Sequence, residues 1–152
     1  RRNLSPEILF DSICETSHCL PDAVQLLTPC SIGNGWLKII DVGRFAIALY
    51  DKHSGNGVRV HLDHRRLESW GEIKSWFLRL KPKHEQSRER LMDEMLRAGV
   101  SVLGIARISI QKEFLEHRHG APIALCPACG EAYPSEHGAR CRACLGALPY
   151  KV

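Results

Sequence analysis

Apolar residues in the first half of the chain follow the spacing of β-strands. Residues 36–42 form one apolar run, and residues 44–50 form a second, nearly continuous run, as expected for a strand covered on both faces. Residues 58–62 alternate between apolar and polar side chains with a period of two, after a short polar connection. The sequence therefore predicts an antiparallel hairpin, with Gly43 marking a bend or bulge before it.

Helical spacing dominates other stretches. Pro21 fits the first turn of a helix, and Pro29 ends that helix at or before Thr28. Asp63 can cap a second helix, which Pro82 closes and whose apolar residues, tryptophans included, are predicted to be core. The residues at helical spacing in this second helix are Leu67, Trp70, Ile73, Phe77 and Leu80.

A third helix is predicted from about Gln86 to Ala98, with Gly99 at its end. Its apolar face is expected to carry Leu91, Met92, Met95 and Leu96. Residues 100–110 then predict one strand, or two strands joined by a bulge. The apolar residues among residues 1–16 are too few to choose between a helix end and a strand, and Cys14 among them is predicted to be buried.

The most specific signal lies near the C-terminus. Cys126 and Cys129 form one Cys-x-x-Cys pair, and Cys141 and Cys144 form another, each soon followed by a glycine. Such turns direct backbone N–H groups at their thiolates, so two of them hold one tetrahedral zinc ion with no open position. An iron–sulfur or rubredoxin-type centre uses the same ligands and stays open. His137, between the pairs, is predicted to be a bystander.

Residues 111–122 are the expected boundary between two domains. The elements before it predict a sheet with packed helices at residues 1–120, and the cysteine pairs predict a four-cysteine finger at residues 121–152. The finger carries three basic residues and two acidic ones. A phosphate-binding face needs clustered lysine and arginine, so a structural zinc staple is favoured over a nucleic-acid reader.

Charge and cysteine content narrow the partners further. The chain has 152 residues and a formal charge of +4, and four thiolates on one Zn²⁺ lower this charge to about +2. No stretch of 18 uncharged apolar residues exists, so we expect no membrane span and no membrane partner. Seven cysteines, four of them in Cys-x-x-Cys pairs, favour a reducing cytoplasm with metal sites over a disulfide scaffold.

Cys19 is predicted to lie just before a helix N-terminus, and Cys30 just past the C-terminus of the same helix. The helix dipole and the free N–H groups lower the pKa of a thiol at the N-terminus, so Cys19 is placed to be a thiolate or a metal ligand. Eleven steps of about 1.5 Å separate the two cysteines by roughly 16 Å, too far for one zinc ion. Cys19 therefore needs partner ligands from elsewhere in the chain or from another chain.

The neighbours of Cys19 each have a functional and a plain interpretation. His18 and Glu15 could reach a metal, or they are solvated neighbours of a helix cap. Asp22 and Gln25 lie on the next helical turn and could orient the thiol, although Asp22 equally satisfies the helix dipole and Gln25 equally fits an exposed helix position. Cys30 is predicted to be a buried structural cysteine, or to line the same cleft across a dimer axis.

Several of these stretches, in this order, resemble the FmdE family, which is named for one component of formylmethanofuran dehydrogenase. The matching stretches are residues 18–30 (HCLPDAVQLLTPC), 33–35 (GNG), 42–46 (VGRFA), 50–52 (YDK), 57–60 (GVRV) and 126–131 (CPACGE). They span nearly the whole chain. The cysteine–helix–cysteine segment joined to the Gly-x-Arg-Val hairpin is the more specific part of the match.

The resemblance implies an α+β core with an antiparallel sheet, an accessory treble-clef zinc finger and a homodimer. The family is associated with the molybdenum or tungsten formylmethanofuran dehydrogenase of methanogenesis, so the resemblance implies dehydrogenase subunits as partners. The family's candidate metal-binding cleft uses a cysteine at the position of Cys19 together with an N-terminal His-Gly-His segment. That segment is absent from this sequence, so either it lies in a part of the protein that the sequence does not include, or the cleft lacks two ligands. Catalysis belongs to other subunits of the complex and is not carried over.

Three functions remain in competition at this level. The first is a metal-binding accessory subunit or partner of a C1 oxidoreductase, with a possible second metal near Cys19. The second is an enzyme in which Cys19 is a nucleophile or holds a catalytic metal, which needs a base such as His18 within hydrogen-bond reach. The third is a zinc-finger adaptor or regulatory protein with no catalytic role.

Overall fold

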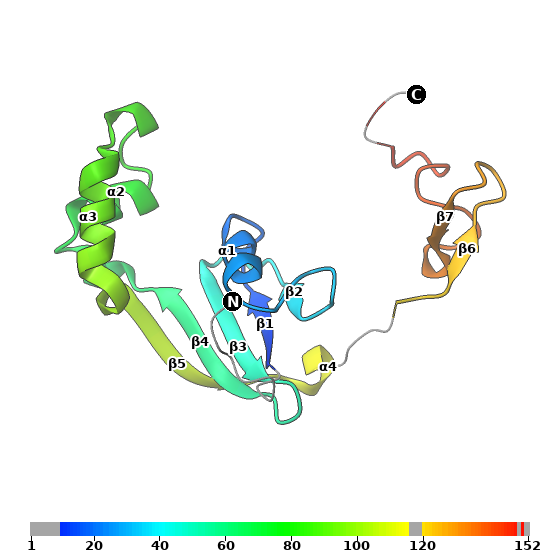
Figure 1. Ribbon diagram of the computed structural model, residues 1–152, viewed down its shortest axis with the longest axis horizontal. Helices are drawn as coiled ribbons and strands as arrows, with labels where there is room; N and C mark the ends of the chain where they lie inside the picture. Colours follow the sequence, from blue (N-terminus) through cyan, green and yellow to red (C-terminus); the bar gives the residue numbers. More distant parts are fainter. Residues whose placement is uncertain (1–9, 116–119, 149, 151–152) are drawn as a thin grey trace. The chain divides into compact units, whose positions relative to one another are not determined.

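The computed structural model describes residues 10–115, 120–148 and 150, and it divides the chain into two compact units. The first unit is Arg1–Glu116 and the second is His117–Val152. The first holds the predicted sheet and helices, and the second holds the four-cysteine finger (Figure 1).

A five-stranded sheet is the frame of the first unit (Figure 1). Its strands are β1 (Phe10–Cys14), β2 (Leu37–Ile39), β3 (Ala46–Asp51), β4 (Asn56–Leu62) and β5 (Leu103–Ser109), in the spatial order β2-β1-β3-β4-β5. All neighbouring strands are antiparallel except β1 and β2, which are parallel. The predicted α+β class with a mainly antiparallel sheet is confirmed.

The predicted hairpin is formed by β3 and β4, in which Ala46 lies opposite His61 and Tyr50 opposite Gly57. Asp51 organises its turn, because its side-chain oxygen accepts hydrogen bonds from the backbone N–H groups of His53 (3.1 Å) and Ser54 (2.7 Å). These are the side-chain-to-backbone bonds by which aspartate favours turns.

The N-terminal residues whose pattern left helix and strand open form β1, and β1 is an interior strand of the sheet. Two of its buried side chains are polar, Asp11 and Ser12. The Lys52 ammonium lies 3.3 Å from the Asp11 carboxylate and 3.3 Å from the centroid of the Trp36 ring. A buried charge of this kind is tolerated because it is paired.

Helix α1 (Leu20–Leu27) packs on one face of the sheet, and Thr28 ends it as predicted. Val24 of α1 contacts a buried cluster with Cys14 and Leu37 of the sheet and with Cys30. On the opposite face, Ala48 and Tyr50 form a second cluster, to which Leu115 of the short helix α4 (Lys112–Leu115) adds. β3 is therefore covered on both faces, as its apolar run predicted.

The long helix predicted after Asp63 is wrong, because the structure divides this stretch into a 3₁₀ turn (His64–Leu67) and α2 (Gly71–Phe77). Asp63 caps the 3₁₀ turn through the N–H of Arg65. Gly71, a weak helix former, begins α2, and the Glu94 carboxylate accepts the N–H groups of Glu72 (2.9 Å) and Ile73 (3.0 Å) there. A carboxylate from another helix thus replaces the local cap.

Trp76 also departs from the prediction that the tryptophans are core, since it is 41% exposed, and Leu80 is 60% exposed. The chain leaves the helical path at Leu78, so the spacing of five apolar residues no longer places them on one buried face. The buried cluster here contains Leu67 and Ile73, with Trp70 and Phe77 packed beside them.

Helix α3 (Arg88–Ala98) begins after the cap Ser87 and ends at Gly99, as the pattern predicted within two residues. Only half of its predicted apolar face packs: Leu91 and Met95 join the cluster around Ile73, whereas Met92 and Leu96 are exposed. The stripe is narrower than expected because α2 is a single, short partner helix.

β3 and β4 approach each other so closely at Gly57 that there is no room for a side chain. A Cβ at Gly57 would meet the Leu49 carbonyl oxygen and lie 2.7 Å from Tyr50 Cα. We expect Gly57→Ala to lower the free energy of unfolding by about 1–3 kcal/mol, because both obstructions involve backbone. Gly33→Ala is the matched control, since a Cβ there meets nothing within 4 Å. Equal effects of the two substitutions in denaturant unfolding would contradict the register.

Candidate metal centre

The second unit is built around a short hairpin, β6 (Ile123–Leu125) and β7 (Ala132–Pro134). Cys126 and Cys129 lie in the turn between these strands. Gly130 closes the turn with φ +77°, a conformation that favours glycine, and its N–H donates to the Cys126 carbonyl at 2.8 Å. The N–H of Cys126 in turn donates to the Glu131 carbonyl at 2.8 Å, which locks the first cysteine pair.

The second pair, Cys141 and Cys144, lies in an equivalent turn. The N–H of Cys144 donates to Cys141 Sγ at 3.4 Å, and Gly146 closes the turn with φ +93°. Tyr133 of β7 is buried beside Cys126 and Cys141, and its hydroxyl donates to the Gly138 carbonyl at 2.8 Å. The tyrosine thus ties the segment between the pairs to the hairpin.

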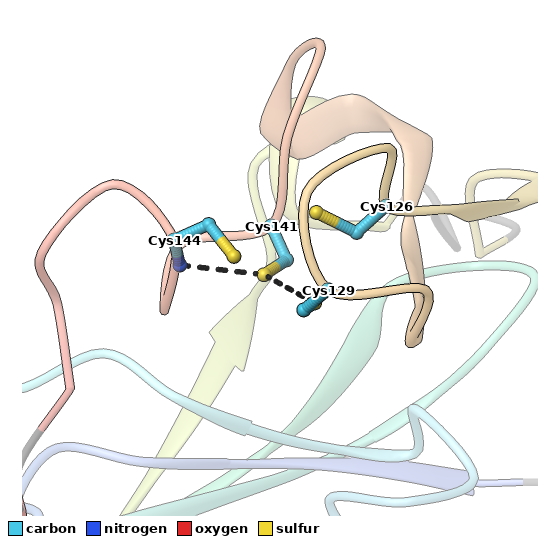
Figure 2. Close-up of side chains that lie close together, drawn as sticks. All are labelled: Cys126, Cys129, Cys141 and Cys144. Carbon is cyan, nitrogen blue, oxygen red and sulfur yellow. Dashed lines mark hydrogen bonds between the residues drawn. The ribbon is translucent and has the colours of Figure 1, made fainter. Parts of the chain in front are cut away.

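The four sulfur atoms face one another (Figure 2). They all lie within 4.8 Å of one another, and Cys129 Sγ is 3.8 Å from Cys141 Sγ. A tetrahedral zinc ion with Zn–S bonds of about 2.3 Å places its sulfurs about 3.8 Å apart. The spacing therefore fits one zinc ion, and His137 is not part of the group.

Electrostatics give the same conclusion. Backbone N–H groups of Cys141 and Cys129 point at Cys126 and lower the pKa of its thiol to about 6. Hydrogen bonds to Cys141 and Cys129 instead raise the pKa of the Cys144 thiol to about 12. Four thiolates this close repel one another, so all four ionise only around a cation. The donors fit structural Zn²⁺, which they enclose completely.

Cys19 stands apart from this centre. It is the exposed N-cap residue of α1, and it belongs to no group of three or more metal-ligating side chains in the described part of the chain. Its neighbour His18 stacks on Phe45, with ring centroids 5.8 Å apart. Ser17 donates to the Asp41 carboxylate at 2.5 Å. The loop before β3 therefore holds the segment that carries Cys19.

The other residues predicted around Cys19 differ in their surroundings. Asp22 is exposed, and the Gln25 side-chain oxygen accepts the Ile32 N–H at 3.2 Å. Cys30 is fully buried, and its thiol donates to the Phe10 carbonyl at 3.5 Å. The structure thus places Cys30 with the core residues, in agreement with the plainer of its two interpretations.

Sequence reasoning missed the ion pair that anchors the start of this segment. The Arg59 guanidinium donates to both carboxylate oxygens of Glu15, at 2.5 and 2.7 Å. The Glu15 carbonyl accepts the N–H groups of Val42 and Arg44, so the same residue ties the loop before β3 to β1. The sequence held no signal for this pair because its partners are 44 residues apart.

An α+β core followed by a four-cysteine treble-clef finger defines a class of two-part, metal-binding proteins. The chain belongs to the FmdE family: residues 1–108 match the family described as "FmdE, Molybdenum formylmethanofuran dehydrogenase operon". Residues 117–151 match the family described as "FmdE treble clef zinc finger".

A crystal structure of a tungsten formylmethanofuran dehydrogenase FmdE-like protein from Syntrophus aciditrophicus is similar over most of both chains. It is 50% identical, with a TM-score of 0.81 over 98% of this chain and 78% of that one. A "Probable S-adenosyl-L-methionine-binding protein" of Archaeoglobus fulgidus is 30% identical over 130 residues, which are 79% of this chain. The match spans 36% of the length of that curated relative.

Metal content tests the centre. We expect one zinc per chain, retained in Cys19→Ser and lost in the Cys126→Ser/Cys129→Ser double variant, because the double variant removes half of the enclosing sulfurs. Elemental analysis of the purified proteins measures this. Zinc that persists in the double variant, or is lost with Cys19→Ser, would contradict the assignment.

The Glu15–Arg59 pair predicts a pH dependence of stability. The hydrogen bond from Arg59 holds the pKa of Glu15 below its ordinary value of 4.5, so the pair stabilises the fold above that pH and loses its effect as the pH falls further. We expect Glu15→Gln to cost about 1–2 kcal/mol at pH 7, a difference that shrinks below pH 4.5. The exposed Glu89→Gln is the control, and a pH-independent difference would refute the role of the charge.

Proposed function

We propose that this chain is a metal-binding accessory protein, a subunit or partner of a molybdenum- or tungsten-dependent formylmethanofuran dehydrogenase-type C1 oxidoreductase. Family membership and the name of the crystallised relative support this role. The zinc ion of the finger would have a structural role, because its four sulfur ligands leave no open coordination position for a substrate.

The exposure of Cys19 is the observation that supports a functional role for the first unit. Of the three cysteines in the first unit, Cys14 and Cys30 are buried and only Cys19 is exposed. Ser17, His18 and the loop before β3 hold its segment in place. A second metal at Cys19 would need further ligands, from elsewhere in the chain or from another chain, because no group of three or more metal-ligating side chains among the described residues includes Cys19.

A homodimer is one source of such ligands, and exposed apolar side chains support it. Val58 of β4 and Ile105 of β5 lie on the sheet face that carries α1, and both are exposed, as are Leu26 and Leu27 of α1. Burying such side chains against a second copy would be favourable. Sedimentation velocity should show a dimer that Ile105→Glu weakens.

A cytoplasmic location is part of the proposal, because free thiols and metal-bound cysteines persist in a reducing compartment. No described helix combines the length and the apolar character that crossing a bilayer requires.

The alternative is a zinc-finger adaptor or regulatory protein with no catalytic role. Its support is the finger surface, where Ile123 and Leu125 of β6 are exposed, while Ala124 between them packs inward. Exposed apolar strands of this kind mark sites of protein–protein contact. This alternative needs no ligand at Cys19.

Cobalt binding separates the two functions. If the core holds a second metal, the full-length protein takes up a second equivalent of Co²⁺ after the finger is filled. This second equivalent adds thiolate charge-transfer absorption to that of the finger, and Cys19→Ser abolishes the added uptake and the added absorption. Cys144→Ser, which changes an exposed cysteine of the finger, should leave that second equivalent unchanged. If no second equivalent of Co²⁺ binds, either to the protein alone or in the presence of purified dehydrogenase subunits, the adaptor function would be favoured.

A further inference from the structure

The segment that joins α2 to α3 exposes apolar side chains in an unusual concentration. Within five positions, Trp76 is 41% exposed, Leu78 is 44% exposed and Leu80 is 60% exposed. Large apolar side chains exposed singly are normal, but contiguous ones mark an interaction site. We call residues 76–83 the α2–α3 turn.

Positively charged residues alternate with these apolar residues along the sequence, between Glu72 and Glu85. Residues 73–84 contain Lys74, Arg79, Lys81 and Lys83 and no aspartate or glutamate. Lys74 is paired with Glu68 at 2.7 Å, whereas none of the other three takes part in an ion pair with the described residues. The turn therefore presents three uncompensated cations interleaved with exposed tryptophan and leucine.

Hydrogen bonds fix the path of the chain through this turn. The Leu80 N–H donates to the Ser75 carbonyl at 2.9 Å, so the chain folds back on the last turn of α2. Arg79 makes this reversal possible by adopting φ +54°, a left-handed conformation usually given to glycine. The Gln86 amide then donates to the Lys81 carbonyl at 2.8 Å and fixes the outgoing end of the turn.

We propose that the α2–α3 turn is a peripheral contact site for the surface of an anionic phospholipid bilayer. Tryptophan is favoured at the membrane–water interface, and exposed leucines bury their apolar area in the headgroup boundary. Lysine and arginine keep their charges at the phosphates while their stems cover apolar surface. Because hydrogen bonds already fix the backbone of the α2–α3 turn, binding would cost little conformational entropy.

Two other partners fit the same surface less well. Single-stranded RNA is bound through aromatic faces, and the turn offers one exposed aromatic ring with two leucines, which cannot stack on bases. Protein interfaces deplete lysine, whereas two of the three uncompensated cations are lysines. The absence of a long apolar stretch led us to expect no membrane partner, but it bears only on spans, and a peripheral contact requires no span.

Vesicle binding tests this site. The full-length, zinc-loaded protein is sedimented with sucrose-loaded vesicles of phosphatidylglycerol and phosphatidylcholine, or of phosphatidylcholine alone. We expect binding to the anionic vesicles that falls with salt, with at least about tenfold weaker binding for Lys81→Glu/Lys83→Glu. Leu80→Ser should weaken it severalfold. Trp76→Phe should retain binding but lose the blue shift of tryptophan emission that accompanies it.

Matched controls separate this surface from net charge and from folding. Arg107→Glu/Lys112→Glu makes the same change of charge at exposed positions elsewhere in the first unit, and Leu96→Ser removes an exposed leucine from α3. Both should bind anionic vesicles like the unaltered protein. Absence of binding to anionic vesicles, or equal losses in the two charge-reversal variants, would overturn the proposal. So would tight binding of a single-stranded RNA with no vesicle binding.

Discussion

Four closely spaced thiolates repel one another, so the second unit depends on a metal ion that binds all four. The unit has 36 residues, and its buried cluster consists of Cys126, Tyr133 and Cys141 with two alanines beside it. So small a core does not stabilise a fold by itself. Metal binding to the four sulfurs is therefore the source of its stability, and binding and folding of this unit are one process.

In the first unit, long-range contacts hold the segment that carries the exposed thiol of Cys19. The Glu15–Arg59 pair fixes the end of β1, and the Glu15 carbonyl receives the loop that leads into β3. In that loop, Asp41 accepts a hydrogen bond from Ser17, and the Phe45 ring stacks on His18. The neighbours of Cys19 thus contact the loop before β3, although α1 has no side-chain cap at this position.

The features that the sequence predicted are those set by local spacing. The two Cys-x-x-Cys turns, the hairpin of β3 and β4 and the ends of α3 each depend on residues a few positions apart. The sequence does not predict β1 as a strand, because Asp11 and Ser12 are buried polar residues that break its apolar pattern. The break before α2 depended on Glu94, which lies in another helix.

The candidate site shows the same division. The finger ligands followed from their spacing, whereas the surroundings of Cys19 depend on pairs such as Ser17–Asp41 and Arg59–Glu15, which are separated by 24 and 44 residues. Trp76 lies within α2 and is 41% exposed, so its exposure depends on how little of this helix other elements cover. Helical spacing alone places Trp76 no differently from a buried neighbour.

X-ray absorption at the zinc K-edge of the purified protein shows directly whether four sulfurs enclose one zinc ion. We expect one zinc ion in a shell of four sulfurs at about 2.3 Å, with no nitrogen or oxygen ligand. A shell that mixes sulfur with lighter atoms, or a folded second unit that holds no metal, would contradict it.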